Sequence, residues 1–272
     1  MLPKGDAEAF RHAVLDFYSR EGRDFSWRRT RDPWSILVSE VMLQQTQTHR
    51  VEPKYDAWME RFPDARSVAV APLPDLYDAW RGLGYNSRAV RLRETARLCV
   101  EKYLGVPPAE EKALLALPGI GRYTARAVMA FAWGLPSAFL ETNIRAAIIF
   151  HFFKGIGKVG DKELEAIADE LVDTADPRTW YYALMDYGAW LKKREPNPAR
   201  KAAAYKRQSS FQGSVRQARG AVLRALSLQA PVGLAWMAAE SGIDYSRLRA
   251  AAEGLQRDGL IELTGDAASF AR

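Results

Sequence analysis

Helical periodicity governs most of this chain. Apolar residues recur three and four positions apart through most of residues 6–190, which is the spacing of an amphipathic helix. No alternation typical of a β-strand precedes residue 230. We therefore expect an all-α fold for this part of the chain. The pattern predicts a short proline-led helix over 107–117 and longer helices over residues 33–48, 86–104, 121–133 and 161–175.

The pattern changes after residues 195–213, a stretch rich in proline, lysine and arginine that is typical of a linker. Two short strands that turn at Gly265–Asp266 are predicted in residues 260–271, after helices over residues 214–228, 233–242 and 244–259. Three helices followed by a hairpin is the order of a winged-helix domain. Such a domain would contact another protein, or would bind DNA through a third helix that carries Arg247, Arg249 and Arg257.

The charge balance favours a polyanionic partner. The 272-residue chain carries a formal net charge of +6, and residues 192–219 hold nine Lys or Arg side chains against one acidic side chain. Such a cluster suits contact with successive phosphates, although a solvated linker has the same composition. The sequence contains no run of about 18 apolar residues and no signal-peptide pattern. We therefore expect a cytoplasmic protein without a membrane span.

Cysteine and histidine are scarce in this chain. Cys99 is the single cysteine, which excludes an internal disulfide. The three histidines, His12, His49 and His151, are far apart in the sequence. A zinc or iron–sulfur site built from these side chains is therefore not expected.

A glycine turn separates two of the predicted helices. The string LPGIGRYTA at residues 117–125 places Gly119 and Gly121 after Pro118 and before the next helix. Successive backbone N–H groups in such a turn, with the positive end of the helix dipole, form an anion site that a phosphate would fill. Thr124 would cap the helix or touch the phosphate. A plain turn between helices has the same composition, so the string alone leaves both interpretations open.

Five strings follow one another along the chain, namely SWRRTRDPWSILVSEVMLQQTQ at 26–47, WRGLGYNSRAVRL at 80–92, LPGIGRYTARAV at 117–128, FLETNIRAAI at 139–148 and MDYGAW at 185–190. Together and in this order they resemble the MutY adenine DNA glycosylases of the helix-hairpin-helix (endonuclease III) superfamily. The resemblance implies a two-lobed glycosylase domain at residues 1–208, and the order of helices and hairpin described above predicts a winged-helix domain at 215–272. One lobe would be a six-helix barrel at about 35–135, and the other would combine 1–34 with 136–208.

Two acidic residues match the catalytic positions of that family. Glu40 lies between Val38 and Val41 on an apolar helix face, where desolvation would raise its pKa and keep it protonated as a general acid. The resemblance implies that Glu40 protonates the adenine ring. Glu141 stands where the family usually has aspartate, and it would support the positive charge that develops on the sugar. Asn143 matches the asparagine that holds this carboxylate or a water.

The remaining positions carried over from the family concern the flipped base and the DNA strands. Tyr123 replaces the lysine that bifunctional members use to form a Schiff base, so the resemblance implies base excision without an associated lyase step. Tyr85 would wedge beside the opposing base. The residues expected around the flipped base are Arg23, Trp27 and Arg28. The residues expected to contact DNA are Gln44, Gln45, Thr46, Leu83, Tyr85, Gly119, Gly121, Arg122, Thr124, Lys192 and Lys193.

The chain departs from the family in two ways. The four cysteines that usually follow the fifth string are absent, and Lys192 takes the place of the first, so no iron–sulfur cluster is expected. Basic side chains would contact phosphates directly instead, and the hairpin would take at most a loosely bound alkali ion. Residues 215–272 are also too few for the Nudix-like domain that typically recognises 8-oxoguanine, which leaves the opposing base in question.

The favoured function is a monofunctional DNA glycosylase in base excision repair that removes a mispaired base, adenine by preference. The alternatives are a glycosylase for thymine or uracil opposite guanine, a glycosylase with lyase activity, and a non-catalytic binder of damaged DNA. The expected partner is double-stranded DNA with a mismatch or lesion, bound by a monomeric, nucleoid-associated protein. The base excised, the base required opposite it and the stereochemical course stay open at this point.

Overall fold

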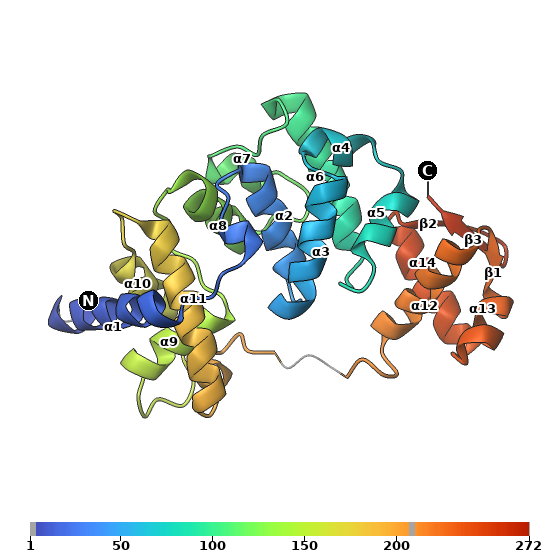
Figure 1. Ribbon diagram of the computed structural model, residues 1–272. Coiled ribbons are helices and arrows are strands. Elements are labelled where there is room, and N and C mark those ends of the chain that lie inside the picture. Colours follow the sequence, from blue (N-terminus) through green and yellow to red (C-terminus); the bar gives the residue numbers. More distant parts are fainter. Residues whose placement is uncertain (1–3, 207–209, 272) are drawn as a thin grey trace. The chain divides into compact units, whose positions relative to one another are not determined.

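The computed structural model describes residues 4–206 and 210–271 (Figure 1). Packing divides the chain into two compact units. Within the described residues, unit 1 comprises residues 4–40, 108–116 and 120–206, and unit 2 comprises residues 41–107, 117–119 and 210–271. The domain boundary expected at residue 208 lies outside the described residues, and independent domains at 1–208 and 215–272 stay a prediction. None of the helices in the described ranges is long and apolar enough to cross a membrane.

Helix α11 is the centre of packing in unit 1. The helices of this unit are α1 Lys4–Glu21, α7 Glu111–Leu115, α8 Arg122–Trp133, α9 Thr142–Phe152, α10 Asp161–Leu171 and α11 Pro177–Arg194, with the 3₁₀ helices η1 Ser26–Arg28 and η2 Pro198–Lys201. α11 packs against α9, α1 and α8, and it buries the side chains of Trp180, Tyr181 and Leu184. Helix α2, Pro33–Leu43, continues from unit 1 into unit 2.

The residues at the helix ends explain these bounds. α8 starts after Gly121 and ends at Gly134, which adopts the left-handed conformation typical of a helix C-terminus, with φ of 65°. α11 starts at Pro177 because Asp176 accepts a hydrogen bond from Thr179 N at 3.1 Å and proline suits the first helical position. The prediction of a helix over 121–133 is confirmed by these signals.

Two predicted helices end four or five residues earlier than the sequence pattern indicated, and the helix expected over 107–117 is confined to α7, Glu111–Leu115. The helix expected over 33–48 ends at Leu43, because Gln45 has a φ of 56°, which is incompatible with a right-handed helix. The helix expected over 161–175 ends at Leu171, and Asp173 then forms a turn by accepting a hydrogen bond from Ala175 N at 2.9 Å.

The first part of the expected linker is packed rather than solvated, which corrects that expectation. η2 packs on α9 and buries Pro198 and Ala199. Val159 N donates to Lys201 O and Val159 O accepts from Ala203 N, both at 2.9 Å. Proline and basic residues indicated a linker, but the small apolar side chains between them are buried against unit 1.

α9 and α11 approach each other closely at Gly188. A Cβ atom on Gly188 would lie 2.0 Å from the carbonyl oxygen of Asn143. Side chains do not tolerate such a contact, so glycine is required at this point of α11. The contact places the backbone of α11 directly against the first turn of α9.

Unit 2 contains four helices before its C-terminal part, namely α3 Thr48–Arg61, α4 Ala65–Val70, α5 Leu73–Trp80 and α6 Ser87–Tyr103. α4 packs on α6, and α3 packs on α5. The rings of Trp58 and Trp80 meet edge to face with centroids 5.4 Å apart, and both side chains are fully buried. The loop between α5 and α6 contains Gly82 and Gly84, which both have positive φ angles.

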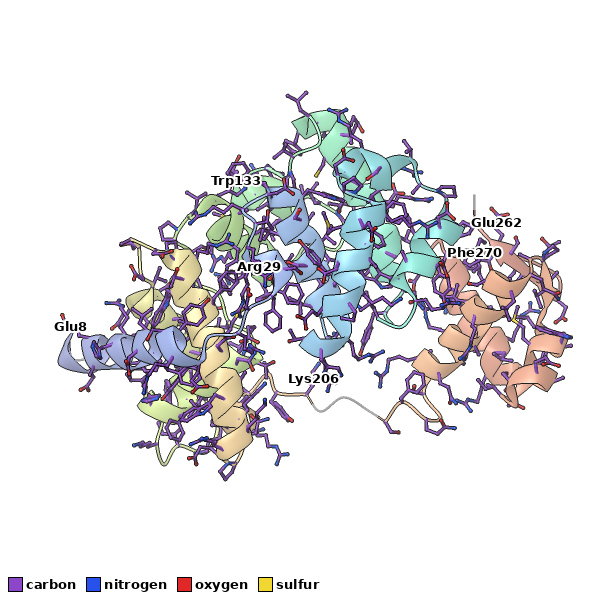
Figure 2. The ribbon with its side chains drawn as sticks, viewed as in Figure 1. Glu8, Arg29, Trp133, Lys206, Glu262 and Phe270 are labelled. Carbon is purple, nitrogen blue, oxygen red and sulfur yellow. The ribbon has the colours of Figure 1, made fainter. Side chains whose placement is uncertain are left out.

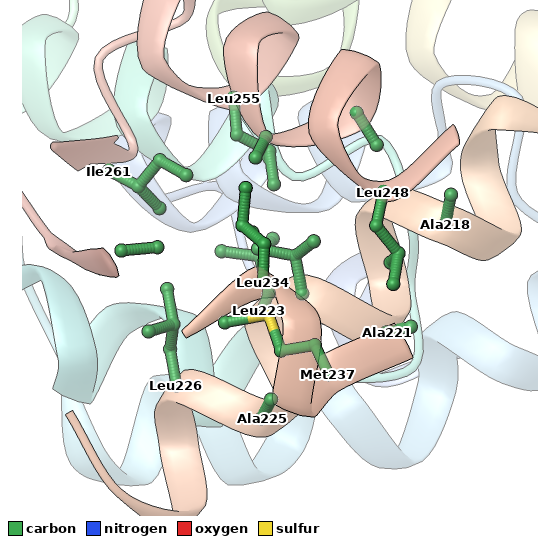
Figure 3. Close-up of a cluster of buried hydrophobic side chains, with 14 of the residues drawn as sticks. Ala218, Ala221, Leu223, Ala225, Leu226, Leu234, Met237, Leu248, Leu255 and Ile261 are labelled. Atoms are coloured by element: carbon green, nitrogen blue, oxygen red, sulfur yellow. The ribbon is translucent and has the colours of Figure 1, made fainter. Parts of the chain in front are cut away.

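The C-terminal module, which we define as residues 210–271, completes unit 2. It comprises α12 Val215–Leu228, β1 Val232–Gly233, α13 Leu234–Ser241, α14 Tyr245–Arg257, β2 Ile261–Thr264 and β3 Ala267–Phe270. The antiparallel sheet has the order β1-β3-β2, with Glu262 on β2 and Phe270 on β3 (Figure 2). Figure 3 shows Leu223, Leu234 and Leu255 pointing from the three helices into one core. The predicted helices and hairpin are confirmed, whereas the two-residue β1 is too short to leave a sequence pattern.

Candidate active site

Glu40 lies in the last turn of α2 and is buried, with 3% of its surface exposed. Burial raises its pKa from 4.5 to about 7, and the charge of Glu141 contributes to the increase. A hydrogen bond from the Tyr123 hydroxyl to Oε2, at 2.8 Å, and the charge of Arg28 act in the opposite direction. The carboxyl group is therefore close to half protonated at neutral pH, as the apolar helix face predicted.

Tyr123 lies in the first turn of α8 and faces both carboxyl groups. Its ring meets Phe139 edge-on, with centroids 5.6 Å apart. Burial raises the pKa of the phenol well above its ordinary value, and the charges of Glu40 and Glu141 raise it further. The hydroxyl therefore keeps its proton and acts as the donor to Glu40.

Glu141 caps α9 with its own side chain. Oε1 accepts hydrogen bonds from the backbone N–H groups of Asn143 at 2.6 Å and Ile144 at 2.8 Å, and Oε2 accepts one from Asn143 Nδ2 at 3.1 Å. Burial raises the pKa of Glu141, while these backbone hydrogen bonds and the charges of Lys192 and Arg23 oppose the increase. The carboxylate is thus held in one orientation by the helix that follows it.

The two carboxyl groups and the tyrosine form one site within unit 1. The charge of Glu141 raises the pKa of Glu40, and both charges raise the pKa of Tyr123. The three residues come from α2, α8 and the N-terminus of α9, so the fold brings distant parts of the chain together. One carboxyl group can donate a proton near neutral pH, and the other has its oxygens fixed by N–H donors. Such a pair suits a reaction that protonates a leaving group and stabilises a cation.

Asp186, on α11, binds both arginines that the sequence placed around a flipped base. Arg28 donates from Nη1 and Nη2 at 2.8 Å, and Arg23 donates from its backbone N at 2.7 Å and Nε at 2.8 Å. Burial opposes ionisation of Asp186, but the hydrogen bonds and charges of Arg28 and Arg23 outweigh it and lower the pKa. Trp27 is buried and stacks on Phe25, with ring centroids 4.7 Å apart. These contacts fix η1, and the part that its residues play around a base stays a prediction.

Arg88 is buried in the first turn of α6, within unit 2, and backbone carbonyl groups surround its guanidinium. Burial lowers the pKa of Arg88 to about 10, so the group is still charged at neutral pH. It ties the C-terminal end of α2 and the loop between α5 and α6 to a single point. The acceptors are the carbonyl oxygens of Val41 (2.8 Å), Met42 (2.9 Å), Gln44 (2.7 Å), Leu83 (3.4 Å), Gly84 (2.9 Å) and Tyr85 (3.3 Å).

The two segments that Arg88 holds contain residues with strained backbones. Gln45 has a φ of 56° and Tyr85 a φ of 47°, in the left-handed region that residues other than glycine rarely adopt. Thr46 links the segments, because its hydroxyl accepts from Arg88 Nη2 at 3.0 Å and donates to Leu83 O at 3.3 Å. Gln45 is exposed and Tyr85 half-buried. Leu83 is buried, so its side chain lies inside the unit and not at a surface that DNA would reach.

The glycine turn before α8 has the predicted conformation. Gly119 has a φ of 79°, its carbonyl accepts a hydrogen bond from Gln44 Nε2 at 3.4 Å, and Gly121 is the N-cap of α8. Arg122 is exposed, in keeping with a surface that meets a phosphate. Thr124 is 2% exposed, so its side chain is directed into unit 1 and a phosphate contact would fall to the backbone N–H groups. The anion site itself stays a prediction.

Lys192 and Lys193, at the end of α11, lie in different surroundings. Lys193 is exposed, whereas Lys192 is half-buried. The charge of Lys192 acts against the increase in the pKa of Glu141, and burial lowers the pKa of Lys192 itself. Lys192 therefore belongs to the surroundings of the second carboxylate.

Similarity to known proteins identifies the family. Residues 38–203 match the HhH-GPD superfamily of base excision DNA repair proteins. The chain belongs to this superfamily. An adenine DNA glycosylase of Mycolicibacterium smegmatis is 34% identical to it over 93% of this chain and 92% of that protein. The human adenine DNA glycosylase is 37% identical over 68% of this chain, which covers 36% of the human protein. A thermostable thymine-DNA glycosylase of known structure has a TM-score of 0.64 at 32% identity, over 68% of this chain and 87% of its own.

The HhH-GPD fold agrees with the predicted all-α class. In residues 4–206 the chain forms helices, and β-pairing in that range is confined to the single bridge between Val159 and Ala202. The small sheet lies in the C-terminal module, beyond the 38–203 range that the superfamily matches. Both the fold class and the suspected family are confirmed.

Metal-binding groups are scarce in this HhH-GPD protein. Within the described ranges, no group of three or more His, Cys, Asp or Glu side chains could hold a metal ion. Cys99 is buried in α6, and burial raises the pKa of its thiol to about 12. The thiol is therefore unreactive at neutral pH.

Two residues that hold the HhH-GPD site in place were not singled out from the sequence. Asp186 stands in the MDYGAW string between apolar residues, and an acid at such a position is a signal that a buried cation lies nearby. Arg88 follows the GLGYNS string, but its partners are carbonyl groups. Every residue has a carbonyl group, so this arrangement leaves no pattern in the side chains.

Proposed function

We propose that this chain is a DNA glycosylase that removes adenine from mispairs in duplex DNA during base excision repair. The observation that carries the proposal is the buried Glu40 carboxyl group, with a pKa of about 7, in contact with Tyr123 and coupled to Glu141. The Mycolicibacterium smegmatis relative that matches 93% of this chain is an adenine DNA glycosylase. The thymine-DNA glycosylase matches 68% of it. Adenine is therefore favoured over thymine or uracil.

Glu40 would act as the general acid. Adenine is a poor leaving group as an anion, so the base gains a proton while the N-glycosidic bond breaks, after it has been turned out of the stack. A carboxyl group with a pKa of about 7 holds its proton up to neutral pH and gives it up readily. Tyr123, which donates to Oε2, would stabilise the carboxylate that forms.

Glu141 would stabilise the positive charge that develops on the deoxyribose. The N–H groups of α9 hold Oε1 and the Asn143 amide holds Oε2, so the carboxylate is oriented in advance of the reaction. The charges of Lys192 and Arg23 favour its ionised form. The same position would serve for attack on the sugar, as in retaining glycosidases.

Water then adds to C1′ of the deoxyribose in place of the departed base and loses a proton, so the proposed reaction leaves an abasic site in an intact strand. A lyase step needs an amine that forms a Schiff base with the sugar, and Tyr123 supplies none. Lys192 is the lysine whose charge acts on Glu141. The Lys192 amine is therefore the group to test for a Schiff base by borohydride trapping.

We also propose that excision proceeds without an iron–sulfur cluster. This chain supplies one cysteine, Cys99, which is buried in α6. Packing of η2 on α9 and the two hydrogen bonds of Val159 hold the segment after α11. Iron analysis of the purified protein, alongside its excision rate, checks this proposal, and activity that requires added iron would contradict it.

A panel of duplexes tests the function. Adenine opposite guanine, 8-oxoguanine or cytosine is compared with thymine and uracil opposite guanine, and strand cleavage after alkali measures base release. Release of adenine with nicks that appear only after alkali supports the proposal. Nicks without alkali, or a borohydride-trapped complex that Lys192→Ala abolishes, would contradict the absence of a lyase step. Tight binding with no release from any duplex would contradict an enzyme.

A further inference from the structure

The C-terminal module is fixed on the helices of unit 2 through a tyrosine. Tyr77 of α5 is buried in the apolar core of the module, and its ring lies 5.7 Å from that of Phe270 on β3. Val90 of α6 packs against the same core. Burial raises the pKa of Tyr77 to about 12, so the phenol stays neutral at this junction. The hairpin is thus engaged in packing, and the position of α12 relative to the loop between α5 and α6 is set.

Two arginines of the module are engaged by acids within it. Arg249 on α14 pairs with Glu253 at 3.0 Å and donates to Gly265 O at 3.1 Å. Arg219 on α12 pairs with Asp258 at 2.5 Å. Among the arginines expected to bind DNA through the third helix, Arg249 is therefore partly neutralised. A third arginine of the module, Arg216 on α12, contacts the rest of unit 2.

Arg216, in the first turn of α12, contacts Tyr85 in the loop between α5 and α6. Its guanidinium carbon lies 5.8 Å from the centroid of the Tyr85 ring, and that of Arg88 lies 5.6 Å from the same centroid. The ring of Tyr85 is thus in contact with one cation from its own helix–loop segment and one from the module. Arg88 is buried and donates to carbonyl groups, and Arg216 is half-buried.

Two residues close to Arg216 in the chain are apolar and exposed. Phe211 is 60% exposed and Val215 is 69% exposed. The turn that carries Phe211 is ordered, because Ser214 donates from N at 3.1 Å and from Oγ at 2.6 Å to Phe211 O. Gln217 closes the turn by accepting from Gly213 N at 2.8 Å. A guanidinium flanked by exposed apolar side chains matches the chemistry by which proteins insert into duplex DNA, and its charge complements the phosphates.

We propose that Arg216 is a DNA-contacting residue of the C-terminal module that acts with Tyr85 to set which base is accepted opposite the excised one. A guanidinium can donate two hydrogen bonds to the acceptor edge of a purine, and the Tyr85 ring below it would hold its plane. The choice of base rests on the function proposed above, whereas binding of the duplex by Arg216 does not. The left-handed backbone of Tyr85 is consistent with a loop that is built for a purpose other than stability.

Point variants test this proposal without removing the module, because truncation would expose Tyr77. Arg216→Ala and the matched control Arg224→Ala, an exposed arginine two turns further along α12, are compared in an otherwise inactive Glu40→Gln background. Fluorescence anisotropy measures affinity for duplexes with adenine opposite guanine, 8-oxoguanine or cytosine. Arg216→Ala should weaken binding to the two purine-opposed duplexes at least about fivefold more than to the cytosine duplex. Arg216→Lys, which lacks the planar fork, should lose most of the discrimination while keeping the charge.

The outcomes separate the inference from the function on which it depends. Equal weakening on all three duplexes, or an affinity pattern like that of Arg224→Ala, would overturn the assignment of Arg216 to base choice. Thermal unfolding of Arg216→Ala within about 2 °C of the parent shows that packing of the module is intact. Should the parent enzyme with Glu40 release no adenine while Arg216→Ala still weakens duplex binding, the proposed excision would fail and the contact of Arg216 with the duplex would stand.

Discussion

Each unit buries one ionisable side chain beside a different part of α2. The side chain in unit 1 is close to half ionised at neutral pH, whereas the one in unit 2 stays charged. In unit 1 the pKa of Glu40 rises to about 7, and in unit 2 that of Arg88 falls to about 10, because burial disfavours the charged form of both. Carbonyl groups satisfy Arg88, so it stays ionised. Glu40 lies near a second carboxylate and can lose or gain a proton at neutral pH. The many hydrogen bonds of Arg88 hold the surrounding backbone in place, whereas the pKa of Glu40 allows it to exchange a proton at neutral pH.

The largest effect is expected from Glu40→Gln, which removes the proton donor and keeps the size of the side chain. Base excision should fall about 10³-fold, since general-acid catalysis contributes about 10²–10⁴-fold. Affinity for duplex DNA should change less than about threefold, because no charge at the DNA surface is altered. Single-turnover excision and equilibrium binding measure the two quantities. Glu8→Gln, at an exposed site on α1, is the matched control (Figure 2).

Arg88→Ala should have the next largest effect and should separate the two regions most clearly. Loss of the guanidinium leaves several buried carbonyl groups without a donor, so the free energy of unfolding should fall by about 3 kcal/mol. The two loops lose their common anchor, and duplex affinity should fall about tenfold or more. Arg88→Lys should recover part of both. Any activity that is left should keep the pH profile of the parent, and a shifted profile would show that Arg88 also acts on Glu40.

The pH dependence tests whether Glu40 is poised as described. The protonated form is the active one, so the excision rate should decrease as the pH rises through about 7. Glu40→Gln should abolish that decrease in the residual rate. A rate that is flat from pH 5 to pH 9 in the parent would argue against Glu40 as the acid.

The same shift affects stability, with a defined sign. The folded protein binds the Glu40 proton more tightly than the unfolded chain, so this stabilisation is complete below about pH 4.5 and is lost as the pH rises to about 7. The loss from this group is about 3 kcal/mol. Denaturant unfolding at several pH values should show a steeper decline for the parent than for Glu40→Gln, and parallel curves would contradict the raised pKa.

The smallest effect is expected from Tyr123→Phe. The Tyr123 hydroxyl stabilises the carboxylate form of Glu40, so its removal should raise the pKa of Glu40 and move the alkaline decrease in rate upward by about one pH unit. The rate at pH 6 should change less than about tenfold, because the acid is protonated there in both proteins. A shift to lower pH would show that the hydroxyl does not donate to the carboxylate.

Local signals predicted much of the fold and part of the site. Gly121 and Gly134 bound α8 as the sequence indicated, and the apolar neighbours of Glu40 were a sound guide to its raised pKa. Both features depend on residues within a few positions of one another. The all-α class followed from the helical period for the same reason.

Features that depend on tertiary packing could not be predicted in this way. The binding of Arg28 to Asp186 joins residues 158 positions apart, and burial of Thr124 depends on how α8 packs. The prediction of a solvated linker at 195–213 was wrong in its first part, because η2 packs on α9 and no local sequence pattern indicates that contact. The contact of Arg216 with Tyr85 likewise depends on tertiary packing, because Tyr77 of α5 lies in the core of the C-terminal module.

The absence of a side chain at Gly188 has a mechanical consequence. The α-hydrogens of Gly188 are the only atoms between the backbone of α11 and Asn143 O, so there is no free space between α11 and the start of α9. A displacement of α11 toward α9 would therefore move the first turn of α9, whose Asn143 and Ile144 N–H groups hold Oε1 of Glu141. We therefore expect substitutions on α11 that do not contact the reacting nucleotide, at Asp186 for example, to change the position of the Glu141 carboxylate.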